Sequence, residues 1–220
     1  MIAAVITGGP GIDCDVLREI AGSSDIIYCA DSGADTAVRA GIPVTKVFGD
    51  MDSISSETLE YLKRNNIPLE IYPEDKDLTD TEICIREIPE DAEIMLIMSL
   101  TGRIDHVLTN LDLAMRLHGE GRDITATDGV TDVFFLKGDD MIGVTGLIDP
   151  VGLSVSLISP DEKDIARGAS CEGLYYPFEN ADIPYGTGHF NSNSIAPGCD
   201  AFKVSIKEGK LMVFVTLKGL

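Results

Sequence analysis

The sequence has no tryptophan, and its five cysteines are scattered without a CxxC pair. This spacing argues against a disulfide framework or a zinc knuckle and favours a reducing compartment, so we expect a cytoplasmic protein. No apolar run approaches the roughly 18 residues that a membrane-spanning helix needs. The apolar N-terminal segment lacks a basic region before it, which is typical of a buried strand and a turn rather than a signal peptide.

Basic residues are also scarce, with 17 Lys and Arg against 37 Asp and Glu and a formal net charge of −20. Such a surface repels nucleic acid and anionic lipid, so we expect neither as a partner. A small anionic substrate remains compatible with this charge if it arrives with a cation or meets a local basic group. The hydrophobic fraction of 44% is sufficient for a substantial core.

Apolar, β-type runs alternate with helix-like runs in the first part of the chain. The expected strands are residues 2–6, 26–30, 44–48, 69–72 and 94–98. The expected helices are residues 13–21, 34–40, 55–65, 79–88 and 105–118. This alternation predicts a Rossmann-like α/β domain with a mostly parallel sheet, and the nearly continuous apolar strands indicate helices on both of its faces.

The pattern changes near residue 128, after which short β-type runs are punctuated by Gly, Pro, Asn and Asp. The expected strands are residues 132–136, 141–144, 153–158, 201–206 and 211–217. These runs predict an all-β sandwich, so we divide the chain into an α/β domain, 1–128, and a β-sandwich domain, 129–220. Residues 178–200 are expected to form a long irregular loop.

Two aspartates, Asp50 and Asp52, follow the third expected strand in the motif GDMDS. In an extended segment they would point the same way, and two adjacent carboxylates repel unless a cation joins them. Mg²⁺ is a suitable cation, but Asp52, Ser53 or Ser55 alternatively caps the next helix. The motif TGGPG after the first strand is likewise either a phosphate cradle or a plain turn.

The motif DKDLTDTE follows the fourth expected strand and adds further carboxylates, Asp77 and Asp80, together with Lys76. Thr79 and Glu82 have capping-box spacing, which predicts a helix start. A cap needs a single acidic or hydroxyl group, so it does not account for the remaining carboxylates and the lysine.

The motif TGRIDH follows the fifth expected strand and contributes Arg103, Asp105 and His106. Because parallel strands end at the same edge of a sheet, all these motifs should crowd one rim. Carboxylates for Mg²⁺ beside basic groups for phosphate oxygens are what a metal–polyphosphate complex requires. His106 is either a catalytic group or a hydrogen-bonding residue at the start of a helix.

Taken together and in order, these motifs resemble the thiamine pyrophosphokinase family. The matching segments are DSGA (31–34), GDMDS (49–53), DKDLTDTE (75–82), TGRIDH (101–106) with Asn110, and GLYYPF (173–178) with Ser192 and Asn193. Thr101 and Ser32 stand where the family pattern has glycine, and Tyr175 stands where a lysine is common.

The resemblance implies an α/β domain joined to a β-sandwich, a homodimer, and Mg²⁺-dependent transfer of the pyrophosphoryl group of ATP to the thiamine hydroxyl, with AMP released. It implies metal-binding roles for Asp50, Asp52, Asp80 and Asp105, which with Asp77 form the catalytic set. It implies ATP contacts by Asp31, Lys76, Thr79, Arg103 and His106, with Asp77 also near the triphosphate. It implies thiamine contacts by Tyr176, Ser192 and Asn193, with Tyr176 acting across the dimer.

The predicted chemistry is in-line attack of the thiamine hydroxyl on the β-phosphorus of ATP, with Asp77 or Asp105 accepting the proton. Two other functions are compatible with the sequence. One is a Mg²⁺-dependent phosphate-ester hydrolase, and the other is a nucleotide-binding regulatory module without catalysis.

Overall fold

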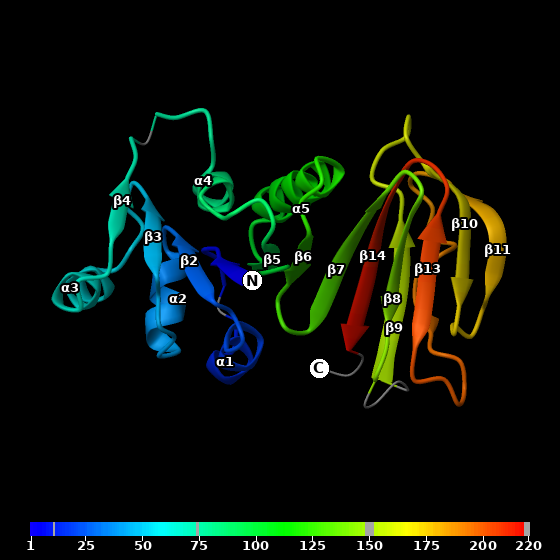
Figure 1. Ribbon diagram of the computed structural model, residues 1–220, viewed down its shortest axis with the longest axis horizontal. Helices are drawn as coiled ribbons and strands as arrows, with labels where there is room; N and C mark the ends of the chain where they lie inside the picture. The colour runs from blue at the N-terminus through cyan, green and yellow to red at the C-terminus, as the bar shows by residue number, and fades with distance from the viewer. Residues whose placement is uncertain (11, 74, 148–151, 218–220) are drawn as a thin grey trace. The chain divides into compact units, whose positions relative to one another are not determined.

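The computed structural model describes residues 1–10, 12–73, 75–147 and 152–217 (Figure 1). It divides into two compact units, the first comprising residues 1–117 and 121–129 and the second residues 118–120 and 130–220. Gly11, the last residue of the TGGPG motif, and Glu74, which directly precedes the DKDLTDTE motif, lie outside the described residues. No described helix is long and apolar enough to cross a membrane.

The first unit is built on parallel strands that alternate with helices. Its strands are β1 (Ile2–Ile6), β2 (Ile26–Ala30), β3 (Lys46–Gly49), β4 (Leu69–Ile71), β5 (Glu93–Ile97) and β6 (Ile124–Thr127). They pair in the order β6-β5-β1-β2-β3-β4, and every pair is parallel. The predicted parallel α/β arrangement of this part of the chain is therefore confirmed.

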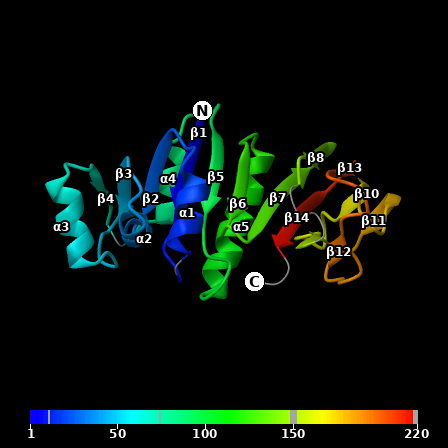
Figure 2. The ribbon, with the colours of Figure 1, turned by 90° about the horizontal axis from the view of Figure 1, so that it is seen from below.

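Helices cover both faces of this parallel sheet. They are α1 (Cys14–Ala21), α2 (Gly33–Arg39), α3 (Ser56–Arg64), α4 (Asp80–Arg86) and α5 (Ile104–Gly119). Figures 1 and 2 show α1, α2 and α3 on one face and α4 and α5 on the other. On the first face, Leu17, Ala37 and Leu62 are fully buried in one cluster with Ile27 and Val47, and removal of this apolar surface from water stabilises the layer.

Side-chain caps set the starts of the helices that lead away from the polar rim. The Ser55 hydroxyl accepts a hydrogen bond from the Thr58 amide at 3.2 Å and begins α3. The Thr79 hydroxyl accepts from the Glu82 amide at 3.2 Å and begins α4. Both caps satisfy an amide that has no partner within its own helix, as expected from the sequence.

The second unit consists of antiparallel strands, apart from the last residues of α5. The strands are β7 (Thr131–Lys137), β8 (Asp140–Val144), β9 (Leu153–Ile158), β10 (Ala166–Glu172), β11 (Phe178–Ile183), β12 (Asn193–Ser194), β13 (Phe202–Ile206) and β14 (Lys210–Leu217). Within this unit, the strands are ordered β12-β9-β14-β7 in one sheet and β11-β10-β13-β8 in the other. Alternate residues of both sheets enter one buried cluster that includes Val155, Val204 and Val213.

Several strands were not expected from the sequence. β6 is a four-residue segment, and β10, with the sequence ARGASCE, has few of the β-branched and aromatic residues that mark strands. The expectation of an irregular loop over residues 178–200 was wrong for β11 and β12. These segments are strands because their backbone groups pair with neighbouring strands, β11 with β10 and β12 with β9.

Candidate active site

A cleft of about 780 Å³ lies at the carboxyl ends of the parallel strands of the first unit. From β1 the strand order runs to β2, β3 and β4 in one direction and to β5 and β6 in the other. Such a reversal leaves a crevice outside the carboxyl ends of the strands, where ligands of open α/β sheets bind. The cleft is lined by the last residue of β2 and by residues that follow β1 to β5: Thr7–Pro10, Ala30–Ser32, Asp50, Ser53, Lys76, Leu78–Thr81, Ser99, Thr101–Arg103, Asp105–Val107, Thr109 and Asn110.

Close backbone packing at Gly33 brings the loops after β1 and β2 together at this cleft. A Cβ atom at Gly33 would lie 2.2 Å from the carbonyl oxygen of Ile6. Only glycine permits that approach without a shift of the backbone. The sequence motif marked a turn at this point but not the contact with β1.

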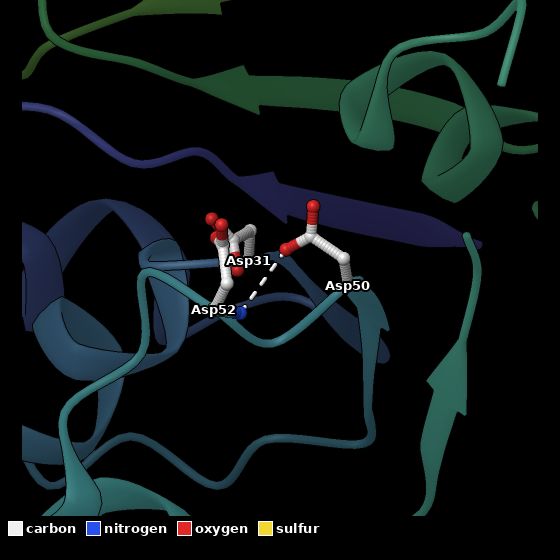
Figure 3. A group of neighbouring side chains, drawn as sticks. All are labelled: Asp31, Asp50 and Asp52. Atoms are coloured by element: carbon white, nitrogen blue, oxygen red, sulfur yellow. Dashed lines mark hydrogen bonds between the residues drawn. The ribbon is translucent and has the colours of Figure 1, made fainter. Parts of the chain in front are cut away.

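Three carboxylates converge here: Asp31 and Asp50, which line the cleft, and Asp52, which adjoins them without being a lining residue (Figure 3). One oxygen from each lies within 4.8 Å of the others. Asp31 follows β2 and Met51 separates the other two, and both adopt the left-handed backbone conformation, with φ of 47° and 68°. These conformations are uncommon for residues other than glycine, and here they turn the chain so that the side chains approach each other.

Asp31 and Asp50 are each tied to the loop after β3. The Ser53 hydroxyl donates to Asp31 Oδ2, and the amide of Asp52 donates to Asp50 Oδ1 at 3.1 Å. The bond from that amide is the main reason why the pKa of Asp50 lies below its usual value. Asp31 Oδ1 is buried and has no hydrogen-bond partner in the part of the chain that the structure describes.

The buried oxygen of Asp31 and the adjoining carboxylates fit a small hard cation. Mg²⁺ prefers carboxylate oxygens, and a cation would relieve the repulsion within the group. Asp31, which sequence reasoning placed among the ATP contacts, therefore belongs to the carboxylate group. Its signal in the sequence was its position directly after a buried strand.

Asp80 and Lys76 form an ion pair beside this group. Lys76 Nζ lies 3.2 Å from Asp80 Oδ1 and donates to the Pro73 carbonyl at 3.1 Å. Burial raises the pKa of Asp80, Lys76 opposes this effect, and the negative charges of Asp31 and Asp50 add to it. Lys76 thus offsets part of the negative charge at this rim.

Arg103 and Asp105, which also line the cleft, pair with each other. The guanidinium donates to both carboxylate oxygens, at 3.2 Å and 2.5 Å, and this pairing lowers the pKa of Asp105. Both side chains are largely exposed, at 73% and 63%. Among the described residues, the carboxylate group that could hold a metal consists of Asp31, Asp50 and Asp52, and it includes neither Asp80 nor Asp105, the two other residues for which a metal-binding role was expected.

The other predicted residues of the first unit are divided between the cleft and the surface. Thr79 and His106 line the cleft, and Thr79 also caps α4. Asp77 is exposed and is not among the lining residues. His106 therefore lies at the predicted rim. Asp77 lies at the surface and does not line the cleft.

The remaining predicted residues belong to the second unit. The Asn193 side chain accepts from the Tyr176 amide at 3.1 Å and donates to the Tyr176 carbonyl at 2.9 Å. Tyr176 is 69% exposed, and its ring lies edge-on to that of Tyr175 with centroids 4.9 Å apart. The Ser192 amide donates to Ser156 Oγ at 2.9 Å. The Asn193 amide group therefore fixes the backbone that presents Tyr176.

Comparison with known proteins assigns this chain to a family. The model described as "Thiamin pyrophosphokinase, catalytic domain" matches residues 17–126, half of the chain, which includes most of the cleft. The chain therefore belongs to the thiamin pyrophosphokinase family.

Individual relatives agree with this assignment. A protein named thiamine pyrophosphokinase from Bacillus subtilis (strain 168) is 29% identical over 114 residues, which span 50% of this chain and 52% of the relative. The sequence match thus covers about half the length of that curated relative. The match does not extend to the other half of that relative, so it does not assign the activity of the whole relative to this chain.

Solved structures extend the likeness to the whole fold. The structure of thiamine pyrophosphokinase from Bacillus subtilis has a TM-score of 0.83 at 20% identity and covers 100% of both chains. That of thiamin pyrophosphokinase from Geobacillus thermodenitrificans has a TM-score of 0.80 at 25% identity, covering 100% of this chain and 99% of the other. The thiamin pyrophosphokinase from Candida albicans, at 17% identity and a TM-score of 0.79, covers 98% and 88%. At such low identity the likeness is one of fold.

Proposed function

We propose that this protein is a thiamine diphosphokinase, which transfers the pyrophosphoryl group of ATP to the hydroxyl of thiamine in a Mg²⁺-dependent reaction. The observation that carries this proposal is the carboxylate group of Asp31, Asp50 and Asp52, two of which line the cleft of the first unit together with Lys76. Carboxylates for a metal and a cation for phosphate are the groups that stabilise a polyphosphate during transfer. Family membership adds thiamine as the acceptor.

In this reaction the thiamine hydroxyl oxygen forms a bond to the β-phosphorus of ATP. The bond from that phosphorus to the oxygen bridging the α-phosphorus breaks, and AMP leaves with the electron pair. Mg²⁺, held by Asp31, Asp50, Asp52 and Asp80, would neutralise charge on the phosphate oxygens. Most of the remaining rate enhancement comes from positioning and fixed charges.

The basic residues of the cleft have separate roles in this proposal. Lys76 leaves its ion pair with Asp80 to contact the triphosphate as a point charge, while Arg103 binds phosphate with its planar fork. Asp105 then loses its partner and accepts the hydroxyl proton. We prefer Asp105 to Asp77 as the proton acceptor because Asp105 lines the cleft. Thr79 and His106 supply further polar contacts to ATP.

The second unit contributes the thiamine contacts in this proposal. Tyr176 offers an exposed aromatic face, which suits the cationic thiazolium ring. Asn193 holds Tyr176 in place, and Ser192 adds a polar group close by in the sequence. We propose that the protein works as a homodimer in which Tyr176 serves the partner's site, and sedimentation of the active protein tests this assembly.

Product analysis tests the proposed reaction. The protein is incubated with ATP, Mg²⁺ and thiamine, and products are followed by ³¹P NMR and anion-exchange chromatography. We expect AMP and thiamine diphosphate in equal amounts, with neither product formed when thiamine or Mg²⁺ is omitted. ADP with thiamine monophosphate, or phosphate released without thiamine, would overturn the proposal, the latter result in favour of a hydrolase. ATP binding without turnover would instead indicate a regulatory module.

A further inference from the structure

Asp35, in the first turn of α2, makes a side-chain connection to the loop that carries Asp50 and Asp52. Its Oδ1 accepts from the Ser55 hydroxyl at 2.6 Å, and its Oδ2 accepts from the Ser55 amide at 3.2 Å. One turn earlier, Asp31 accepts from Ser53 in the same loop. Two aspartate–serine bridges thus join the corner after β2 to the loop after β3.

The Ser55 hydroxyl both donates and accepts a hydrogen bond in this arrangement. It donates its proton to Asp35 and accepts from the Thr58 amide at 3.2 Å, which begins α3. Partial burial alone would raise the pKa of Asp35, but hydrogen bonds from Ser55 and Thr58 hold that pKa below its usual value. The carboxylate is therefore ionised at neutral pH, and its bond to the hydroxyl is a strong, charge-assisted one.

The bridge fixes the far end of a short, strained loop. β3 ends at Gly49, α3 begins at Ser56, and Met51 between them has a φ of 68°. A loop with such a conformation keeps it only where its surroundings hold it. Asp35 itself is not among the residues that line the cleft or form the carboxylate group in the described chain.

We propose that Asp35, acting through Ser55, is a positioning residue that keeps Asp50 and Asp52 within reach of Asp31 for cation binding. Groups behind a metal's direct ligands typically change metal affinity by about 10- to 100-fold when removed. The kinetic part of the inference rests on the proposed function, but the cation-binding part does not.

The test is a titration of the full-length protein with Mn²⁺ alone, followed by electron paramagnetic resonance, alongside thermal unfolding. We expect Asp35→Ala to weaken Mn²⁺ binding about tenfold. We expect its kcat at saturating Mg²⁺ to stay within about threefold of wild type, because every ligand is still present and an excess of Mg²⁺ fills the weakened site. Ser55→Thr retains a hydroxyl and should bind Mn²⁺ nearly as wild type does.

Asp25→Ala is the matched control. Asp25 accepts a hydrogen bond from the Ile2 amide at 2.9 Å, at the amino end of β1 and away from the cleft. Asp25→Ala should lower the unfolding temperature about as much as Asp35→Ala does, since each variant removes an aspartate that bonds to backbone. Unlike Asp35→Ala, it should leave the Mn²⁺ affinity unchanged. If Asp35→Ala does not fold, Asp35→Asn replaces it, with a smaller loss of affinity expected.

Two results with the variants would overturn the inference, and so would one with the wild-type protein. One is wild-type Mn²⁺ affinity in a folded Asp35 variant, and the other is an equal loss of affinity in Asp35→Ala and Asp25→Ala. A wild-type protein that binds no Mn²⁺ would also overturn it, since there would be no cation site to position. Loss of affinity in Asp35→Ala alone would support it even if no thiamine diphosphate forms, so this inference and the proposed function fail separately.

Discussion

The two units of the molecule place their charged side chains in different ways. In the first unit, Asp31, Asp50 and Lys76, which follow three different strands, line one cleft. In the second unit, polar and charged side chains form small, separate contacts, as His118 does with Asp140 at 2.8 Å, Arg167 with Asp182 at 3.2 Å, and Lys210 with Asp161 and Asp164 at 3.6 and 3.3 Å.

Strand direction explains this difference. Parallel strands joined by crossover helices all end at the same edge, so the residues after each strand accumulate there. Antiparallel strands end at alternate edges, so the residues that follow them are dispersed. Substitutions at the rim of the first unit should therefore alter chemistry more than stability, whereas substitutions within the second unit should mainly alter stability.

The largest effect is expected from truncation of the core of the second unit. Leu157 is 2% exposed within the cluster shared by the two antiparallel sheets. Leu157→Ala should lower the free energy of unfolding by about 3 kcal/mol, because it removes buried methyl groups and leaves a cavity. Urea denaturation measures the change. Ile158→Ala, on the neighbouring exposed residue, is the control and should change it by less than about 1 kcal/mol.

At the rim of the first unit, Asp50→Asn should lower kcat by about 100-fold or more, since it removes a charge from the proposed cation site. The unfolding temperature should change little, because the site lies at the edge of the sheet. Steady-state kinetics at saturating Mg²⁺ provide the measurement. Asp91→Asn, at an exposed position in the turn before β5, should retain wild-type activity. Near-normal turnover of Asp50→Asn would show that Asp50 does not belong to the proposed cation site.

A smaller effect is expected at the His118–Asp140 pair. Burial of Asp140 would raise its pKa, but bonds from His118 and from the amides of Lys137 and Met141 lower it. A lowered folded-state pKa adds stability at neutral pH, and this contribution is lost as pH falls through that pKa, below about pH 4.

Asp140→Asn should therefore reduce the unfolding free energy at pH 7 by about 1 kcal/mol and flatten its decline in acid. Urea denaturation at a series of pH values measures both quantities. Asp139→Asn changes an exposed neighbour and should leave the pH profile unaltered. If the unfolding free energy of Asp140→Asn declines in acid as steeply as that of wild type, the pair does not stabilise the second unit.

The smallest effect on folding is expected at Tyr176, the exception to the pattern in the second unit. Its ring is 69% exposed, so Tyr176→Ala should change the unfolding free energy by less than about 0.5 kcal/mol. Loss of a cation–π contact with thiamine should raise its KM about fivefold. Tyr185→Ala, at a tyrosine that is 55% exposed, is the control. An unchanged KM would mean that Tyr176 does not contact thiamine.

The sequence by itself determined much of the first unit and of its rim. Continuous apolar runs predicted β1 to β5, and hydroxyl residues predicted the helix starts at Ser55 and Thr79. Because parallel strands share a carboxyl edge, the motifs after them were expected at one place, and the cleft lies there. These features follow from local periodicity and from the chirality of strand–helix–strand units.

The tertiary structure decided which side chains meet and which segments pair. The left-handed conformations of Asp31 and Met51 brought Asp31 into the carboxylate group, while Arg103 engaged Asp105. The strand β10 has little intrinsic β preference and is formed through its pairing with β11 and β13. Backbone torsions at single residues and competition among hydrogen-bonding partners depend on contacts between distant segments, so a motif's spacing does not determine them.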